Sequence, residues 1–235
     1  MEPAVLDAAM KLAASLPDAM GHTVAAAAMD AGGAIYTGVG AGHLTGGPCA
    51  EMVVLGAAAA EAVPLITMVA AGAGGQGILP PCGRCRQTLT ESFPDIGILM
   101  PTWPGEDGPT RVRVSSLLPG AAARPGLSSG PRVVHFAAQY FEDVLAGRKT
   151  STLRFNDPTA IGPVTLLFEY DDGPRTLSGV VTGIRRASMR RLMDEHDCAE
   201  GQGAGDRLLV ALRRHYPGLT PASQMEHVCF RCAAA

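Results

Sequence analysis

The sequence predicts an α/β fold in which a three-layer sheet with helices is followed by a small β-rich domain. Two observations predict this order. Over residues 1–119, apolar runs of strand length alternate with helical patterns, which is the order that builds a sheet covered by helices. Beyond residue 132, short apolar runs recur with few helical patterns between them, which favours a small α+β domain or barrel.

Residues 120–131 separate the two regions. They consist of Gly, Ala, Pro, Ser, Arg and Leu without periodicity, a composition typical of linkers. We therefore predict one domain at residues 1–119 and a second at 132–235.

The first domain is expected to open with an Ala- and Leu-rich helix and a β-hairpin. Asp30-Ala31-Gly32-Gly33 is a turn signal between two apolar runs. A later continuous apolar run predicts a buried strand, and a parallel β-α-β pattern follows. The predicted helices are residues 4–15 and the segments after Cys49 and Cys82, and the predicted strands are 22–29, 34–39, 65–71 and 96–100.

The second domain is expected to contain short strands and two helices. We predict helices around residues 139–145 and 207–215, and strands near 165–170, 179–183 and 227–230.

Two cysteine motifs in the first domain point to metal chemistry. Pro48-Cys49-Ala50-Glu51 is followed some thirty residues later by Pro81-Cys82-Gly83-Arg84-Cys85. A Cys-x-Glu pair and a Pro-Cys-x-x-Cys pair form the signature of zinc-dependent nucleobase deaminases. Three protein ligands leave a fourth zinc position open, as in catalytic sites. We therefore expect Zn²⁺ on Cys49, Cys82 and Cys85, with Glu51 as the acid/base residue; a structural zinc site or unrelated buried cysteines are the alternatives.

The segments around these motifs closely resemble blasticidin-S deaminases of the cytidine deaminase family. The likeness includes residues 36–39, 46–56 and 77–87 and covers about residues 1–120. It implies a cytidine-deaminase-like sheet flanked by helices, the zinc ligands and the acid/base residue named above, and a homotetramer.

One segment departs from the family's pattern. Cytidine deaminases carry an Asn-x-Glu that grips the ribose hydroxyls, whereas this chain has Gly40-Ala41-Gly42 followed by His43. Loss of those side chains predicts a more open sugar side, suited to a bulkier or differently decorated cytosine nucleoside. His43 is the candidate substrate-binding residue here, although the glycines are also explained as simple loop residues.

The second domain contains one lysine in an unusual setting. The chain has 17 Arg and only 2 Lys, and one of these, Lys149, lies beside Arg148 in a segment that runs to Thr152 and Arg154. Lysine can lose its proton when it is partly buried, whereas arginine does not. The segment is thus a candidate second site, and a surface turn is the alternative.

Residues 145–154 resemble the opening motif of the ASCH domain, a PUA-like barrel. The closer likeness is to small ASCH-type amidohydrolases that cleave N4-acetylcytidine, and it covers about residues 132–232. The resemblance implies Lys149, Thr152 and Glu200 as the catalytic set, and Arg154 is a further candidate substrate-binding residue. The residues after Arg154 are less acidic than in those amidohydrolases, which leaves the acyl specificity open.

Charge and hydropathy limit the partners. Residues 1–119 carry 5 basic and 10 acidic side chains, and residues 132–235 carry 13 and 12. This balance is not that of a strong nucleic-acid binder, and the basic cluster at residues 185–191 is typical of a solvated helix face.

The sequence has no apolar run of membrane-spanning length and no signal-peptide pattern after Met1. We therefore expect a cytoplasmic protein without a membrane partner.

Together these patterns favour a zinc-dependent deaminase of a cytosine nucleoside. The second domain would remove an N4-acyl group before the amine is hydrolysed. The alternative is a deaminase whose ASCH-like domain only binds RNA or a nucleotide.

Overall fold

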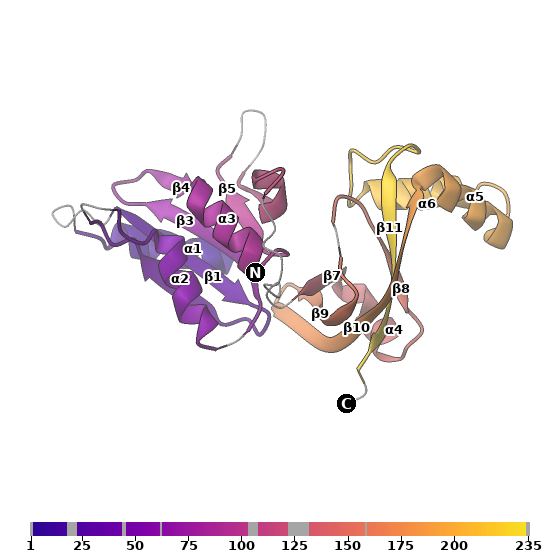
Figure 1. Ribbon diagram of the computed structural model, residues 1–235, viewed down its shortest axis with the longest axis horizontal. Helices are drawn as coiled ribbons and strands as arrows, with labels where there is room; N and C mark the ends of the chain where they lie inside the picture. The colour runs from indigo at the N-terminus through magenta and orange to yellow at the C-terminus, as the bar shows by residue number, and fades with distance from the viewer. Residues whose placement is uncertain are drawn as a thin grey trace. The chain divides into compact units, whose positions relative to one another are not determined.

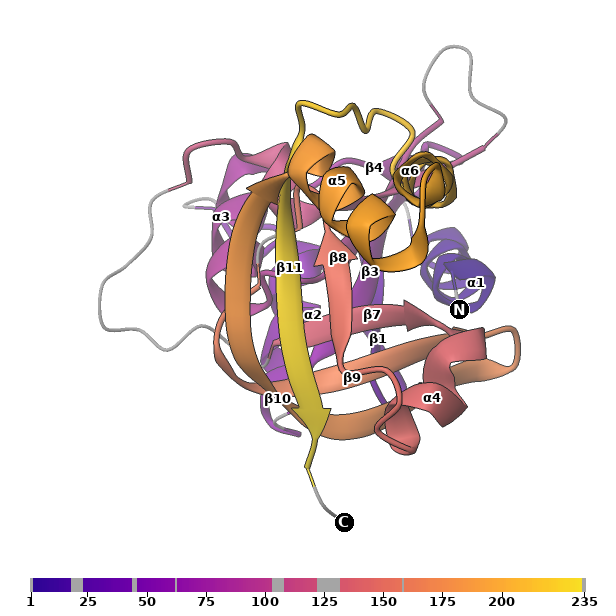
Figure 2. The same ribbon diagram turned by 90° about the vertical axis from the view of Figure 1, so that its right-hand side faces the viewer.

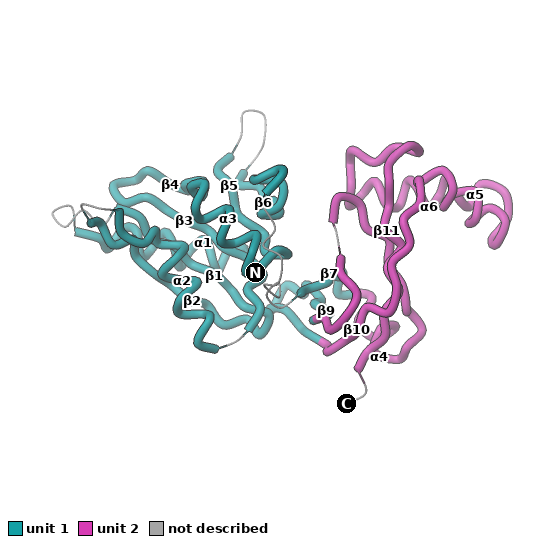
Figure 3. Tube along the Cα trace, viewed as in Figure 1, with its two compact units in different colours: residues 1–138, 165–176 teal, residues 139–164, 177–235 magenta. Residues whose placement is uncertain are grey.

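The computed structural model describes residues 2–17, 23–43, 46–61, 63–102, 108–121, 132–157 and 159–233. The chain has a mixed α/β fold and divides into two compact units (Figure 3), one made of residues 1–138 and 165–176 and the other of 139–164 and 177–235. The linker expected at residues 120–131 lies almost wholly outside the described residues.

The first unit is built on a sheet with helices on both faces (Figure 1). The strand order is β2-β1-β3-β5-β6, with β4 paired to β3. The helices are α1 (Glu2–Ala14), α2 (Ala50–Ala59) and α3 (Gly83–Ser92); the strands are β1 (Val24–Asp30), β2 (Ile35–Val39), β3 (Leu65–Gly72), β4 (Gly77–Leu79), β5 (Gly97–Met100) and β6 (Thr110–Arg113).

Alternate residues of the central strands face the two helical layers, because successive side chains of a strand point to opposite faces. On β1, Ala25 and Ala27 pack in a cluster with α1, whereas Ala26 and Ala28 pack in another with α2 and α3. Alanines on both faces bring the helices close to the sheet. The three-layer arrangement predicted from the sequence is therefore confirmed.

The pairing of the strands is mostly antiparallel. β1 pairs antiparallel with both β2 and β3, and β3 with β5 is the parallel pair that the β-α-β pattern predicts. Strands β4 and β6 were not predicted from the sequence. Both are short, of 3 and 4 residues, and neither has a long apolar run to mark it.

A buried carboxylate within the first unit links its sheet to strand β7 (Val133–Ala137), which belongs to the same unit but pairs in the second sheet. Asp95 is 5% exposed and accepts hydrogen bonds from the side chains of Arg113 and Arg132 and from the backbone N–H of Val133. Two guanidinium groups and a backbone donor satisfy a carboxylate that would otherwise be costly to bury. Residues 132–133 are thereby fixed to the turn that follows α3.

The second sheet has the order β7-β9-β10-β11-β8. Its other strands are β8 (Ser151–Arg154), β9 (Gly162–Tyr170), β10 (Gly173–Ser188) and β11 (Gln224–Cys232). Among the described residues this order has two ends, β7 and β8, so the barrel expected from the ASCH-like motif is not confirmed. Strand β8 was not predicted from the sequence.

The helices of the second unit are α4 (Phe141–Leu145), α5 (Met189–Glu200) and α6 (Ala204–Arg213). α5 and α6 lie side by side near one end of β11 (Figure 2). Helix α5 was not predicted from the sequence. Its N-cap residue is Ser188, whose hydroxyl accepts a hydrogen bond from the backbone N–H of Arg191. In the described part of the chain, no helix has the length and apolar character needed to cross a bilayer.

Asp95→Ala is expected to destabilise the first unit. The substitution leaves Arg113 and Arg132 without their buried partner, and breaking a buried ion pair in this way costs about 3–5 kcal/mol. Urea denaturation followed by far-UV circular dichroism measures the change. The control Asp7→Ala removes the exposed Asp7–Lys11 pair and should change the free energy of unfolding by no more than about 0.5 kcal/mol. Equal effects of both variants would contradict a structural role for Asp95.

Candidate metal and substrate site

Three cysteine sulfurs meet where helices α2 and α3 begin. Cys49 is the N-cap residue of α2, Cys82 is the N-cap residue of α3, and Cys85 lies in the first turn of α3. The Sγ atoms of Cys49 and Cys82 are 3.7 Å apart, and those of Cys82 and Cys85 are 3.6 Å apart. Two helices that leave different strands thus converge through their N-termini, where the partial positive charge stabilises thiolates.

The spacing of these sulfurs fits a zinc ion. Zn–S bonds of about 2.3 Å at tetrahedral angles place two sulfurs about 3.8 Å apart. The three Sγ atoms all lie within 4.8 Å of one another and form the one group of three or more possible ligands found among the described residues. The donor set also fits, because thiolates are preferred ligands of zinc.

The surroundings act differently on two of the thiols. Burial raises the pKa of the Cys85 thiol above its ordinary value, and the negative charge of Glu51 raises it further. Desolvation also acts to raise the pKa of Cys82, but hydrogen bonds from the backbone of Cys85, from the neighbouring thiols and from the backbone of Arg84 lower it overall. A bound cation would favour the thiolate form of the buried Cys85.

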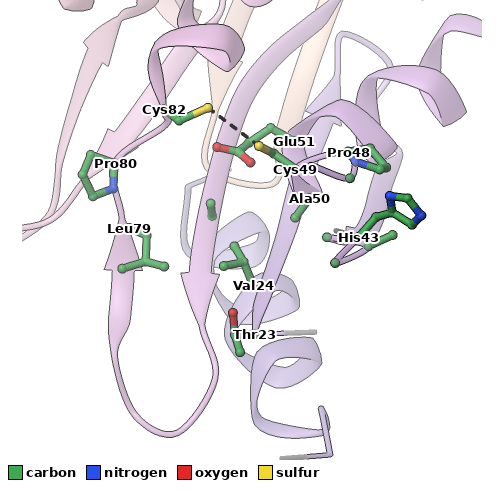
Figure 4. Close-up of a pocket in the computed structure, with 15 residues that line it drawn as sticks. Thr23, Val24, His43, Pro48, Cys49, Ala50, Glu51, Leu79, Pro80 and Cys82 are labelled. Atoms are coloured by element: carbon green, nitrogen blue, oxygen red, sulfur yellow. Dashed lines mark hydrogen bonds between the residues drawn. The ribbon is translucent and has the colours of Figure 1, made fainter. Parts of the chain in front are cut away.

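Glu51 lies in the first turn of α2 and is 5% exposed. It lines a cavity of about 330 Å³ together with Cys49 and Cys82. In Figure 4 its carboxylate is drawn beside the sulfurs of these two cysteines. A buried acid that lines a cavity beside possible metal ligands can exchange protons with a molecule bound there.

The rest of the cavity wall is mostly apolar or formed by backbone. Gly40, Ala41 and Gly42 line the cavity, and so does His43, which is labelled in Figure 4. A Cβ at Gly40 would lie 3.3 Å from the backbone nitrogen of Ala50, so a close approach to α2 favours glycine there. Thr23, Val24 and Ala70 were not predicted as lining residues, because they lie just before β1, on β1 and on β3, away from the cysteine motifs. Leu79 and Pro80, at the end of β4 and just after it, precede the second cysteine motif and had no role predicted from the sequence.

Arg84 in the second cysteine motif and Arg86 just after it have different partners. Arg84 donates from Nη2 to the carbonyl oxygen of Gly47 at 2.8 Å, and the same nitrogen lies 3.7 Å from Cys49 Sγ. Arg86 instead donates to the carbonyl oxygens of Pro81 and Leu117. Of the two, Arg84 is therefore the one that brings positive charge to a sulfur.

Lys149 precedes strand β8 in the second unit. Its side chain is partly buried, and Nζ lies 4.7 Å from the centroid of the Tyr140 ring. Burial lowers the pKa of Lys149, the charge of Arg154 lowers it further, and Asp143 opposes these effects. Thr152 and Arg154 are two residues apart on β8 and so share one face of that strand.

The remaining residues of the second predicted set differ in exposure. Arg154 is 7% exposed and forms an ion pair with Asp157 at 3.0 Å. Glu200 is the last residue of α5, is exposed and pairs with His196 one turn earlier. The structure thus places Lys149, Thr152 and Arg154 on or beside one strand, whereas the described contact of Glu200 is within its own helix.

The basic cluster of residues 185–191 does not form one helix face. Arg185 and Arg186 lie on β10, whereas Arg191 lies on α5. Glu195 pairs with both Arg185 and Arg191, and Glu226 pairs with Arg186. Much of the positive charge is therefore balanced locally, as in a solvated surface.

No family model matches the chain. Among solved structures, it is similar to the cytidine deaminase from Mycobacterium tuberculosis, with 26% identity, a TM-score of 0.44 and coverage of 52% of this chain and 98% of that one. It is also similar to the cytidine deaminase from Mycobacterium leprae, with 28% identity, a TM-score of 0.42 and coverage of 50% and 97%. A further similar structure is the cytidine deaminase from Burkholderia pseudomallei, with 21% identity, a TM-score of 0.42 and coverage of 52% and 99%.

Cys85→Ala is expected to remove zinc from the purified protein. A site with three protein ligands loses one of its anchors, so the metal content should fall from about one zinc per chain to a small fraction of that. Elemental analysis of dialysed protein measures the content. Cys198 is exposed and lies outside the cluster, so Cys198→Ala should retain zinc. Full occupancy in Cys85→Ala would contradict the assignment.

Proposed function

We propose that the first unit is a zinc-dependent hydrolase that deaminates a cytosine nucleoside to its uracil form. The observation that carries this proposal is a cluster of three cysteine sulfurs, two of which (Cys49 and Cys82) line a cavity together with the buried residue Glu51. Nucleobase deaminases require this combination, in which the glutamate is an acid/base and not a zinc ligand. The residues present fit the metal in number, type and spacing.

A zinc ion on Cys49, Cys82 and Cys85 would supply Lewis acidity that makes water a nucleophile near neutral pH. Glu51 accepts a proton from the attacking water and passes it to N3 of the cytosine ring. Glu51 then carries the remaining proton of that water from the new C4 hydroxyl to the exocyclic amine, so that the C4–N4 bond breaks and ammonia leaves while the oxygen stays on C4 as a carbonyl. Burial of Glu51 keeps bulk water from competing for these protons.

The cavity is large enough for a nucleoside. Its volume of about 330 Å³ lies within the range of small-molecule sites. The wall at Gly40–Gly42 has no side chain larger than a methyl group, which supports the proposal that the sugar side accepts a larger group than ribose. His43 at this wall is the proposed sugar-side contact. A homotetramer is also part of the proposal, on the resemblance of the cysteine motifs.

Glu51→Gln is expected to lower the rate of ammonia release by about 10²- to 10⁴-fold, because the amide keeps the shape of the side chain but cannot carry the proton. A panel of cytosine nucleosides with free and substituted sugars, followed by mass spectrometry, measures the product. Glu61→Gln changes an exposed carboxylate just beyond α2 and should leave the rate unchanged. A Glu51→Gln variant with a normal rate and normal zinc content would refute the assigned role.

We propose a second activity for the other unit, the removal of an acyl group from N4 before deamination. The partial burial of Lys149 and its lowered pKa favour this activity, because they increase the share of neutral amine available as a base. Lys149 activates the nucleophile, with Thr152 attacking or positioning it and Glu200 exchanging protons. Overall, a water oxygen joins the acyl carbon, the C–N4 bond breaks and a proton goes to N4.

Lys149→Ala is expected to abolish release of acetate from N4-acetylcytidine, because the base is lost, while deamination of the free nucleoside continues. Chromatography of both products measures the two steps separately. The only other lysine of the chain is Lys11, which is exposed, so Lys11→Ala is the matched control. Acetate release that survives in Lys149→Ala would contradict the proposal. Salt-sensitive RNA binding lost in that variant would favour the binding-module alternative.

A further inference from the structure

Arg84 reaches from helix α3 to two parts of the first cysteine motif. One guanidinium nitrogen, Nη2, donates to the carbonyl oxygen of Gly47 at 2.8 Å and lies 3.7 Å from Cys49 Sγ. The other two sulfurs belong to α3 itself, at Cys82 and Cys85. Arg84 is therefore a side-chain connection between the helix that supplies two sulfurs and the segment that supplies the third.

The segment that Arg84 contacts is closely packed against another part of the cavity wall. A Cβ at Gly47 would lie 1.5 Å from the carbonyl oxygen of Ala41, so only glycine allows this approach. One residue further on, the carbonyl oxygen of Pro48 accepts a hydrogen bond from the backbone N–H of Ala41 at 3.1 Å. Ala41, Gly47 and Pro48 all line the cavity. A hydrogen bond that fixes Gly47 therefore also helps to fix the adjacent cavity wall at Ala41.

The charge of Arg84 is also suited to this place. Three thiolates on one zinc ion leave a net charge of −1, and the carboxylate of Glu51 adds another negative charge nearby. A hydrogen bond from a guanidinium group stabilises a thiolate, and the guanidinium group stays charged across the physiological pH range. The residue that follows Glu51 on α2 is Met52, which brings no charge. Arg84 therefore brings a positive charge beside one of the three sulfurs.

We propose that Arg84 is a positioning residue of the metal site, which holds the Cys49 thiolate and the Gly47 loop in place from α3. This inference rests on the proposed zinc site. Arg84 does not line the cavity, so it acts through the metal ligand and the loop and not through the substrate. Groups that hydrogen-bond to metal ligands typically change metal affinity by 10- to 100-fold when they are removed.

The test is a competition for zinc between the protein and a chromogenic chelator, supported by the absorption spectrum of the Co²⁺-substituted protein. Arg84→Gln should raise the zinc dissociation constant by about 10- to 100-fold and shift the sulfur-to-cobalt charge-transfer bands. Arg84→Lys keeps the charge but loses the planar fork, so its dissociation constant should lie between those of the wild type and Arg84→Gln.

Arg175→Gln is the matched control. Arg175 is an exposed arginine of the same unit that pairs with Asp172, so the variant makes the same change in net charge away from the sulfurs. Its zinc affinity should equal that of the wild type. Circular dichroism of each protein shows whether it is folded. If Arg84→Gln does not fold, the test uses Arg84→Lys, whose zinc dissociation constant should be about three- to tenfold higher than that of the wild type.

Either of two results would overturn the role of Arg84 and leave the proposed function standing. One is a zinc affinity of folded Arg84→Gln within about twofold of the wild type; the other is a loss of zinc affinity in Arg175→Gln as large as that in Arg84→Gln. A wild-type chain that binds no zinc would instead overturn the proposed function and this inference together. The two failures are therefore distinguished by the wild-type measurement.

Discussion

The convergence of two helix N-termini is the arrangement on which the first unit's candidate site depends. Cys49 and Cys82 occupy the N-cap positions of α2 and α3, so their sulfurs lie where free backbone N–H groups and the helix dipoles favour negative charge. The central sheet brings these ends together, because both helices pack in one cluster on the same face of it. The 3.7 Å spacing between the sulfurs of Cys49 and Cys82 is a consequence of that packing, whereas the 3.6 Å spacing of Cys82 and Cys85 follows from their positions three residues apart at the start of α3.

Placing the cysteine thiols and the carboxyl group of Glu51 close together costs free energy when they are ionised, and nearby positive charge offsets that cost. Burial and the charge of Glu51 raise the pKa of Cys85, so the cluster favours a bound cation. Arg84 supplies part of the positive charge at Cys49, and zinc would supply the rest. The cavity, the acid and the metal ligands thus form one electrostatic unit, in which removal of one charge changes the state of the others.

Much of the first unit could be predicted because its signals are local. The apolar run at residues 65–71 marks β3, and Asp30–Gly33 marks the turn before β2: the carboxylate of Asp30 accepts hydrogen bonds from the backbone N–H groups of Gly32 and Ala34.

In the second unit the local sequence signals for strands and helices were weaker. Strand β8 is four residues long, with intermediate exposure at three of them, and α5 has exposed charged residues over much of its length. Their places depend on pairing with β11 and packing against α6.

The sequence by itself determined the candidate chemistry of the first unit, because residue types and spacing decide which groups can bind zinc and carry protons. Cys49, Glu51, Cys82 and Cys85 were identified from their motifs. Only the tertiary structure decided which arginine reaches a sulfur, and which residues of β1, β3 and β4 line the cavity. Arg84 and Arg86 are indistinguishable as letters in the sequence. They differ because residues two apart on a helix point about 200° apart around its axis, so one reaches Cys49 and the other reaches Leu117.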